Sequence, residues 1–257
     1  MGYSNSAVGW FASPSGPPPH EALIILRFQG FDLHCKDLYF YHTRGINKCL
    51  NTKSMSLRRR PGQRMDKDYF IVDFEFTQYT KPVGKPRAFF PEIIEIGAVK
   101  IDYGATEVSG HIEAFVKPCF FPKQAAESMD FCMITESDME DAVGFGDMLE
   151  LMATLYIPGK TYFISWGDAD YSVVAQGCER HAFPNPILRE DYLDLAAAYK
   201  AMKGDRKTTG LYAAADELGI NTDGFRHTAY DDAYNTGMVL LKLIDSGWVP
   251  EHYLGNR

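Results

Sequence analysis

Cysteine is scarce in this sequence, and long apolar runs are missing. The five cysteines are scattered and include no Cys-x-x-Cys pair: Cys35, Cys49, Cys119, Cys132 and Cys178. Their odd number and wide spacing argue against a disulfide framework and against a structural zinc site. No apolar run approaches the roughly 18 residues that span a bilayer, and the first residues do not resemble a secretory signal. We therefore expect a soluble, reduced, cytoplasmic protein with no membrane partner.

Positive charge is concentrated at the start of the chain. Residues 1–64 hold 9 Lys and Arg against 3 Asp and Glu, a net charge of +6, which leaves residues 65–257 at −14 in a chain of net charge −8. The first segment is Pro-rich and lacks periodicity, and its one apolar run, 22–28, could be a short strand or a short helix. We interpret 1–64 as a poorly structured basic leader, either a linker or a segment foreign to the native protein. Its short Arg run could contact nucleic acid or could simply be solvated.

The folded domain is expected to span 65–257, where strand and helix patterns alternate. A hydrophobic content of 46% and a charged content of 23% are ordinary for a globular chain, which excludes global disorder. Strands are predicted at 68–76, 92–102, 111–118, 161–166 and 192–195. Helices are predicted at 135–142, 144–156, 168–181, 208–220 and 227–247. Three consecutive strands followed by alternating strands and helices predict an α/β domain, a mixed five-stranded sheet with helices on both faces.

Two acidic residues lie in the first strand, in the sequence IVDFEF. Asp73 and Glu75 are two residues apart, so both point to the same face of the strand. Their neighbours are apolar, and a pair of like charges there is costly unless something neutralises it. A divalent cation with oxygen ligands would do so. The alternative is an edge strand with both carboxylates in water.

The second acidic candidate follows the strand at 161–166. In the sequence GDAD, helical periodicity places Asp170 on an apolar face toward the sheet and Asp168 on a wetter face. Asp168 also occupies the expected N-cap position. We therefore expect Asp170 to point inward and Asp168 to cap the helix.

The third candidate is the adjacent pair Asp231 and Asp232 on the final helix. The row from Asp232 continues through apolar positions, whereas the row from Asp231 is mostly polar, so Asp232 should face the core. His227 lies just before this helix, where it could reach the same site or could be a structural histidine.

Together these residues have the composition of a two-metal site. Four carboxylates, those of Asp73, Glu75, Asp170 and Asp232, can hold two Mg²⁺ or Mn²⁺ ions that clamp the attacking and leaving oxygens of a phosphodiester. A histidine such as His227 can accept a proton from the attacking water, because its pKa lies near neutral pH.

The motifs DFEF, DAD and HTAYDDAYNT resemble the three motifs of the DEDDh 3′–5′ exonucleases. The stretches KPVGKPRAFFPEIIEIGAV and FCMITESDMEDA are similar to the Eri/KapD-like subfamily. The resemblance covers about 67–247. It implies an RNase H-like fold, two Mg²⁺ or Mn²⁺ ions and release of nucleoside 5′-monophosphates from a 3′ end. Asp73, Glu75, Asp170 and Asp232 would then be the metal ligands, and His227 the general base.

Substrate contacts are predicted at fewer positions. By resemblance, Phe76 and Thr77 would meet the terminal nucleotide, although Phe76 could equally be a core residue. Further candidates are Thr135, Arg206 and Lys207. Because the domain is strongly acidic, a single-stranded or overhanging 3′ end of RNA or DNA fits better than a long duplex. Between the two nucleic acids we favour RNA, although the charge does not distinguish them. Two alternatives stay open: a catalytically silent regulatory or binding module, and a phosphoesterase of short oligonucleotides.

Overall fold

The computed structural model of the 257-residue chain describes residues 66–81, 83–222 and 228–254, together with the backbone of four short strands between residues 24 and 50. The chain divides into two units, Met1–Arg59 and Arg60–Arg257. This division falls close to residue 64, where the composition changes.

The first unit contains two separate antiparallel strand pairs. β1 (Ile24–Phe28) pairs with β2 (Phe31–Cys35), and β3 (Tyr39–Thr43) pairs with β4 (Ile46–Leu50). Residues 24–28 of the apolar run 22–28 therefore form a strand and not a helix. The stretch interpreted as a poorly structured leader thus contains local strand pairing.

The second unit is built on one five-stranded sheet in the order β7-β6-β5-β8-β9. Its strands are β5 (Asp68–Phe76), β6 (Ile93–Ile101), β7 (Gly110–Phe115), β8 (Thr161–Ser165) and β9 (Tyr192–Asp194). β5, β6 and β7 pair antiparallel, whereas β8 and β9 run parallel to β5. The predicted mixed five-stranded sheet is confirmed.

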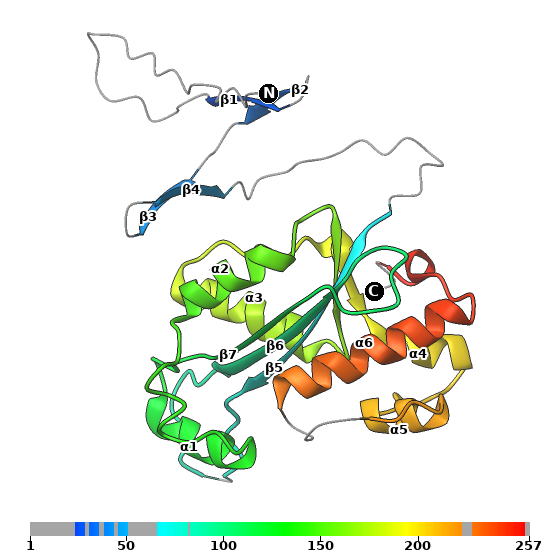
Figure 1. Cartoon of the computed structure of the whole chain (residues 1–257). Coiled ribbons are helices and arrows are strands. Elements are labelled where there is room, and N and C mark those ends of the chain that lie inside the picture. The colour runs from blue at the N-terminus through cyan, green and yellow to red at the C-terminus, as the bar shows by residue number, and fades with distance from the viewer. Residues whose placement is uncertain are drawn as a thin grey trace. The chain divides into compact units, whose positions relative to one another are not determined.

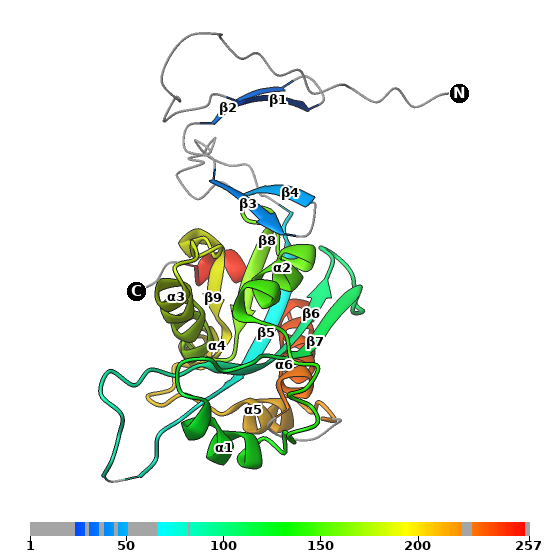
Figure 2. The same cartoon turned by 90° about the vertical axis from the view of Figure 1, so that its left-hand side faces the viewer.

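Helices cover both faces of the sheet (Figures 1 and 2). One face carries α2 (Phe145–Leu155) and α3 (Ala169–His181), and the other carries α4 (Leu195–Lys203), α5 (Leu211–Glu217) and α6 (Ala229–Asp245). The remaining helical segments are α1 (Pro122–Phe131) and two 3-10 turns, Arg189–Asp191 and Pro250–His252. In the described residues, no helix combines the length and apolarity needed to cross a membrane.

Strand β5 separates two apolar cores by its alternation. Phe70, Val72 and Phe74 pack on the α2–α3 side, whereas Tyr69 and Ile71 pack on the α6 side. Because side chains alternate along a strand, the next two residues on the α6 side are Asp73 and Glu75. The apolar α6 face of β5 therefore ends in two carboxylates.

The sequence prediction was wrong between β7 and α2. Residues 135–142 were predicted as a helix opening at Thr135, but they form a series of turns. The local capping pattern is nevertheless present, because Thr135 N–H donates to Asp138 Oδ2 at 2.7 Å and Asp138 N–H donates to Thr135 Oγ1 at 3.3 Å. The preceding helix α1 was missed, although Pro122 at its first turn is a typical helix-start residue.

Candidate active site

The strand pair β5–β6 supplies three acidic side chains on the α6 face of the sheet. In the register of the pair, Asp73 lies opposite Gly97 and Glu75 lies opposite Glu95. Directly opposed residues share a face, so Glu95 is a cross-strand neighbour of Glu75. Glu95 is buried, and it accepts a hydrogen bond from the backbone N–H of Ala229 at the start of α6.

Helix α6 approaches this face closely and adds Asp232. One carboxylate oxygen from each of Asp73, Glu75 and Asp232 lies within 4.8 Å of the other two. The hydroxyl of Tyr212, on α5, donates to Asp232 Oδ1. Asp232 thus lies among the β5 carboxylates on its own helix α6, and the Tyr212 hydroxyl orients it.

Asp231 lies outside this carboxylate cluster. Its Oδ2 accepts from Thr228 Oγ1 at 2.7 Å, so it bonds at the N-terminus of its own helix. The apolar row that continues from Asp232 is buried as predicted: Thr236, Val239 and Leu243. The row that continues from Asp231 was expected to face away from the core. This was partly wrong, because Asn235 in that row is also buried, at 1% exposure.

Asp170 enters the site from the start of α3. It is buried at 5% exposure, and its Oδ1 accepts the backbone N–H of Phe74 at 2.9 Å, the residue between the two β5 carboxylates. Asp168 is exposed and occupies the N-cap position, but its side chain does not make the predicted capping hydrogen bond. Periodicity therefore placed both residues correctly, and the predicted cap interaction was wrong.

The clustering of carboxylates makes their ionisation unfavourable. Burial is the largest cause that raises the pKa of Asp73 well above its ordinary value, and the charge of Asp170 is the next. Three further carboxylates act in the same direction: Asp232, Glu75 and Glu95. Burial also raises the pKa of Asp170 to about 7 and that of Glu95 to about 7. A cation among these oxygens would relieve the repulsion, so the donor set fits a divalent ion with hard oxygen ligands.

Three supporting residues were missed by the sequence analysis. Glu95 stands in an apolar strand, the same signal that singled out Asp73, and could have been found in that way. Tyr212 lies on a predicted helix with no local pattern that marks it. Cys132, which follows α1, lies with its Sγ 3.2 Å from Glu75 Oε2 and donates to it.

The predicted substrate residues have different environments. Phe76 is half-buried and packs against the core on the α2–α3 side. Thr77 is fully buried, and its Oγ1 accepts the N–H of Glu92 at 2.9 Å, so its side chain belongs to the junction between β5 and β6. Thr135 is exposed in the turns after α1. Arg206 and Lys207 are exposed in the segment between α4 and α5. His227 lies outside the described residues.

The family model described as "Exonuclease" (RNase_T) matches residues 70–240, which contain Asp73, Glu75, Asp170 and Asp232. The chain belongs to the exonuclease family. It is 39% identical over 178 residues to the probable 3′-5′ exonuclease KapD of Bacillus subtilis (strain 168), a match that covers 68% of this chain and 83% of KapD.

Two other relatives agree with this family. Human ERI1 exoribonuclease 2 is 28% identical over 205 residues, but the match covers 71% of this chain and only 29% of that longer protein. Among solved structures, the nuclease domain of 3′hExo, a DEDDh family member bound to rAMP, superposes with a TM-score of 0.62 at 22% identity, covering 72% of this chain and 94% of that domain. This exonuclease therefore has the RNase H-like fold of the DEDDh nucleases, and its family hydrolyses nucleic acid from the 3′ end.

Proposed function

We propose that this exonuclease removes nucleotides from the 3′ end of single-stranded or overhanging RNA, in preference to DNA, and releases nucleoside 5′-monophosphates. The observation that carries the proposal is the meeting of Asp73, Glu75 and Asp232 within 4.8 Å on the α6 face of the sheet. The preference for RNA is supported by the name of the human relative, an exoribonuclease, and by the rAMP bound to 3′hExo.

Asp73, Glu75, Asp170 and Asp232 would hold two Mg²⁺ or Mn²⁺ ions. When bound, such ions polarise the scissile phosphate and stabilise the charge that develops on the attacking and leaving oxygens. The protein's part is to fix these ligands before substrate arrives. The backbone N–H of Phe74 orients Asp170, and the Tyr212 hydroxyl orients Asp232. Glu95 holds the start of α6 through Ala229 N–H.

His227 would accept the proton of the attacking water. In the sequence it directly precedes Thr228, the N-cap of α6, and α6 is the helix that brings Asp232 to the β5 carboxylates. Replacing His227 with Ala should lower turnover by roughly 10²–10⁴, as for loss of a general base, while leaving affinity for the ions largely intact. A parallel fall in ion affinity would show that His227 is a ligand instead.

The decisive experiment uses the full chain and 5′-labelled oligonucleotides. Matched single-stranded RNA and DNA are incubated with Mg²⁺ or Mn²⁺, products are resolved as a ladder, and the small products are identified by chromatography. We expect shortening from the 3′ end, faster on RNA, with 5′-monophosphates as products and complete loss in excess chelator. Asp73→Asn serves as the inactive control.

Two results would contradict the proposal. Activity that persists in excess chelator would exclude catalysis by divalent ions. Turnover of dinucleotides with no shortening of longer strands would identify a phosphoesterase of short oligonucleotides. A faster reaction on DNA than on RNA would overturn the substrate preference alone.

A further inference from the structure

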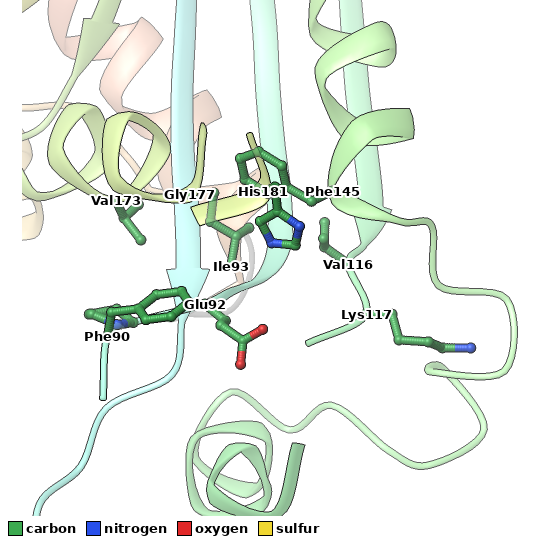
Figure 3. Close-up of a pocket in the computed structure, with 10 residues that line it drawn as sticks. Phe90, Glu92, Ile93, Val116, Lys117, Phe145, Val173, Gly177 and His181 are labelled. Atoms are coloured by element: carbon green, nitrogen blue, oxygen red, sulfur yellow. The ribbon is translucent and has the colours of Figure 1, made fainter. Parts of the chain in front are cut away.

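A second group of potential metal ligands lies outside the cluster of Asp73, Glu75 and Asp232. It joins Glu92, just before β6, Cys119, just before α1, and His181, at the end of α3. Their ligand atoms all lie within 4.8 Å of one another, and the distance from Cys119 Sγ to His181 Nε2 is 4.0 Å. Figure 3 shows the Glu92 carboxylate and the His181 imidazole bordering one small pocket, which is also lined by Phe145 and Val173.

The imidazole of His181 is held in place by aromatic rings. It stacks on Phe145 with ring centroids 4.4 Å apart and an angle of 6° between the ring planes. It also makes a T-shaped contact with Phe120, with ring centroids 4.9 Å apart. Burial lowers the pKa of His181, which favours the neutral form. A neutral imidazole in a fixed orientation is the form that binds a metal.

The Glu92 carboxylate is held in place by backbone groups. Its Oε1 accepts the N–H groups of Cys119 at 2.7 Å and Phe120 at 2.9 Å, and its Oε2 accepts the N–H of Phe121 at 2.6 Å. An ionised carboxylate has about four acceptor positions, and the fourth is taken by the Cys119 thiol, which also hydrogen-bonds to Glu92 and would release this position when a metal replaces its proton. Carboxylates that bind metals are commonly hydrogen-bonded in this way.

Cys119 supplies a thiol beside the His181 imidazole, a pairing of sulfur and nitrogen ligands that the carboxylate cluster does not have among its described residues. Its side chain is exposed and lies against Glu92. Partial desolvation is the largest cause that raises the pKa of the Cys119 thiol, and the charge of Glu92 adds to it, so the sulfur carries a proton at neutral pH. A metal ion that bound here would replace this proton.

We propose that Glu92, Cys119 and His181 form a second metal site, for a thiophilic divalent ion such as Zn²⁺. Zinc with ordinary bond lengths and tetrahedral angles holds sulfur and nitrogen roughly 3.6 Å apart, so the observed 4.0 Å needs only a small adjustment. On binding, the Cys119 S–H bond breaks, a metal–sulfur bond forms, and one proton passes to solvent. Three protein ligands leave the fourth position open.

A metal ion at this site would stabilise the segment that supports Glu75. Glu92 exchanges backbone and side-chain hydrogen bonds with Thr77, two residues after Glu75. Beyond Cys119, helix α1 carries Ser128, which accepts the N–H of Gln78, and leads to Cys132, which contacts Glu75. Zinc would therefore connect the end of α3 to the segment that supports Glu75.

Cobalt provides the test, because Co²⁺ bound to a thiolate absorbs in the near ultraviolet. The reduced full chain is freed of metal, supplied with excess Mg²⁺ for the carboxylate site, and titrated with Co²⁺ and then with Zn²⁺. We expect one equivalent of Co²⁺ to produce the thiolate band and Zn²⁺ to abolish it. Cys119→Ser should lose the band, and His181→Gln should weaken binding by more than about tenfold, the range for a metal's supporting groups.

Matched variants keep the result specific. Cys132→Ser should retain the band, since its thiol lies at the carboxylate site, and His111→Gln, at an exposed histidine, should bind as the unaltered chain does. Circular dichroism of each variant checks folding, and Cys119→Ala replaces Cys119→Ser if the latter is unfolded. Absence of the band in the unaltered chain, its survival in the folded Cys119 variant, or its loss in Cys132→Ser would overturn the proposal. None of these readouts depends on nuclease activity.

Discussion

Gly97 of β6 and Ala229 of α6 lie in direct backbone contact. A Cβ atom built on Gly97 would lie 2.0 Å from the carbonyl carbon of Ala229, far inside van der Waals contact. Because Asp232 follows Ala229 by three residues and Gly97 lies opposite Asp73, this contact sets how near Asp232 comes to Asp73. The lack of a side chain at Gly97 therefore allows α6 to bring the Asp232 carboxylate to the site.

Gly97→Ala should displace the start of α6 and abolish most activity. The added methyl has only backbone to displace, so we expect at least the 1–3 kcal/mol loss of stability that is typical of overpacking. Gly237→Ala is the matched control in the same interface, where a Cβ would meet Val99 Cγ2 at an ordinary 3.4 Å. It should retain activity and gain up to about 1 kcal/mol from helix propensity. Thermal unfolding and initial rates measured side by side decide this, and a fully active Gly97→Ala would show that α6 can shift without consequence.

Asp232→Asn and Asp231→Asn should behave in opposite ways. Asp232 lies within the carboxylate cluster, and an amide is a poorer ligand than a carboxylate for a hard cation, so nearly all activity should be lost. Asp231 bonds to Thr228, and its amide can still accept that bond, so turnover should be nearly unchanged and stability should fall by a few tenths of a kcal/mol. Rates of 3′-end trimming compare the two variants, and an inactive Asp231→Asn would contradict the placement of the helix.

The metal-free protein should become less stable as pH rises. The folded-state pKa is raised to about 7 for both Asp170 and Glu95, so the folded protein binds protons that the unfolded chain releases near pH 4. The contribution of these two protonated groups to the free energy of unfolding is fully present below pH 4 and is lost as pH rises through 7. Melting temperatures in chelator should therefore fall between pH 5 and pH 8, and saturating Mg²⁺ should restore most of the loss near neutrality.

Asp73→Asn is the control for this pH dependence. The variant lacks the carboxylate whose pKa is raised by burial and by four neighbouring carboxylates. In chelator at pH 8, the metal-free variant should therefore melt at a higher temperature than the metal-free unaltered chain. A melting temperature in chelator that rises with pH would contradict the electrostatic account.

Lys67 should be a major contributor to stability at the other end of β5. Its ammonium pairs with the fully buried Asp191, which also accepts from Tyr156 Oη at 3.0 Å and Gly159 N at 2.7 Å. Lys67→Met would leave a buried carboxylate without its counter-charge and should cost about 3–5 kcal/mol. Lys160→Met, at an exposed lysine, should cost less than about 0.5 kcal/mol. Urea unfolding measures both, and equal midpoints would show that the hydrogen bonds alone satisfy Asp191.

Local patterns in the sequence determined the elements of the sheet and the candidate carboxylates. The predicted strand 68–76 coincides with β5. Successive side chains of a strand point to opposite faces of the sheet, so the pattern of one strand can be recognised within a few residues. Helical periodicity likewise separated Asp170 from Asp168 and Asp232 from Asp231, because one residue turns a helix by about 100°. Each of these inferences needs only residues close together in the chain.

Tertiary structure alone decided which distant residues meet. Thr135 and Asp138 form the local hydrogen bonds of a helix start, yet no helix follows, since the first turn is costly and Ile134 instead packs beside Ile94. The opposition of Glu95 to Glu75 depends on strand register. The contact of Gly97 with Ala229 depends on how α6 docks on the sheet. The Glu92, Cys119 and His181 cluster joins three segments with no shared spacing, so the sequence argument against a zinc site could address only local cysteine motifs. Packing of remote segments, rather than local periodicity, built these features.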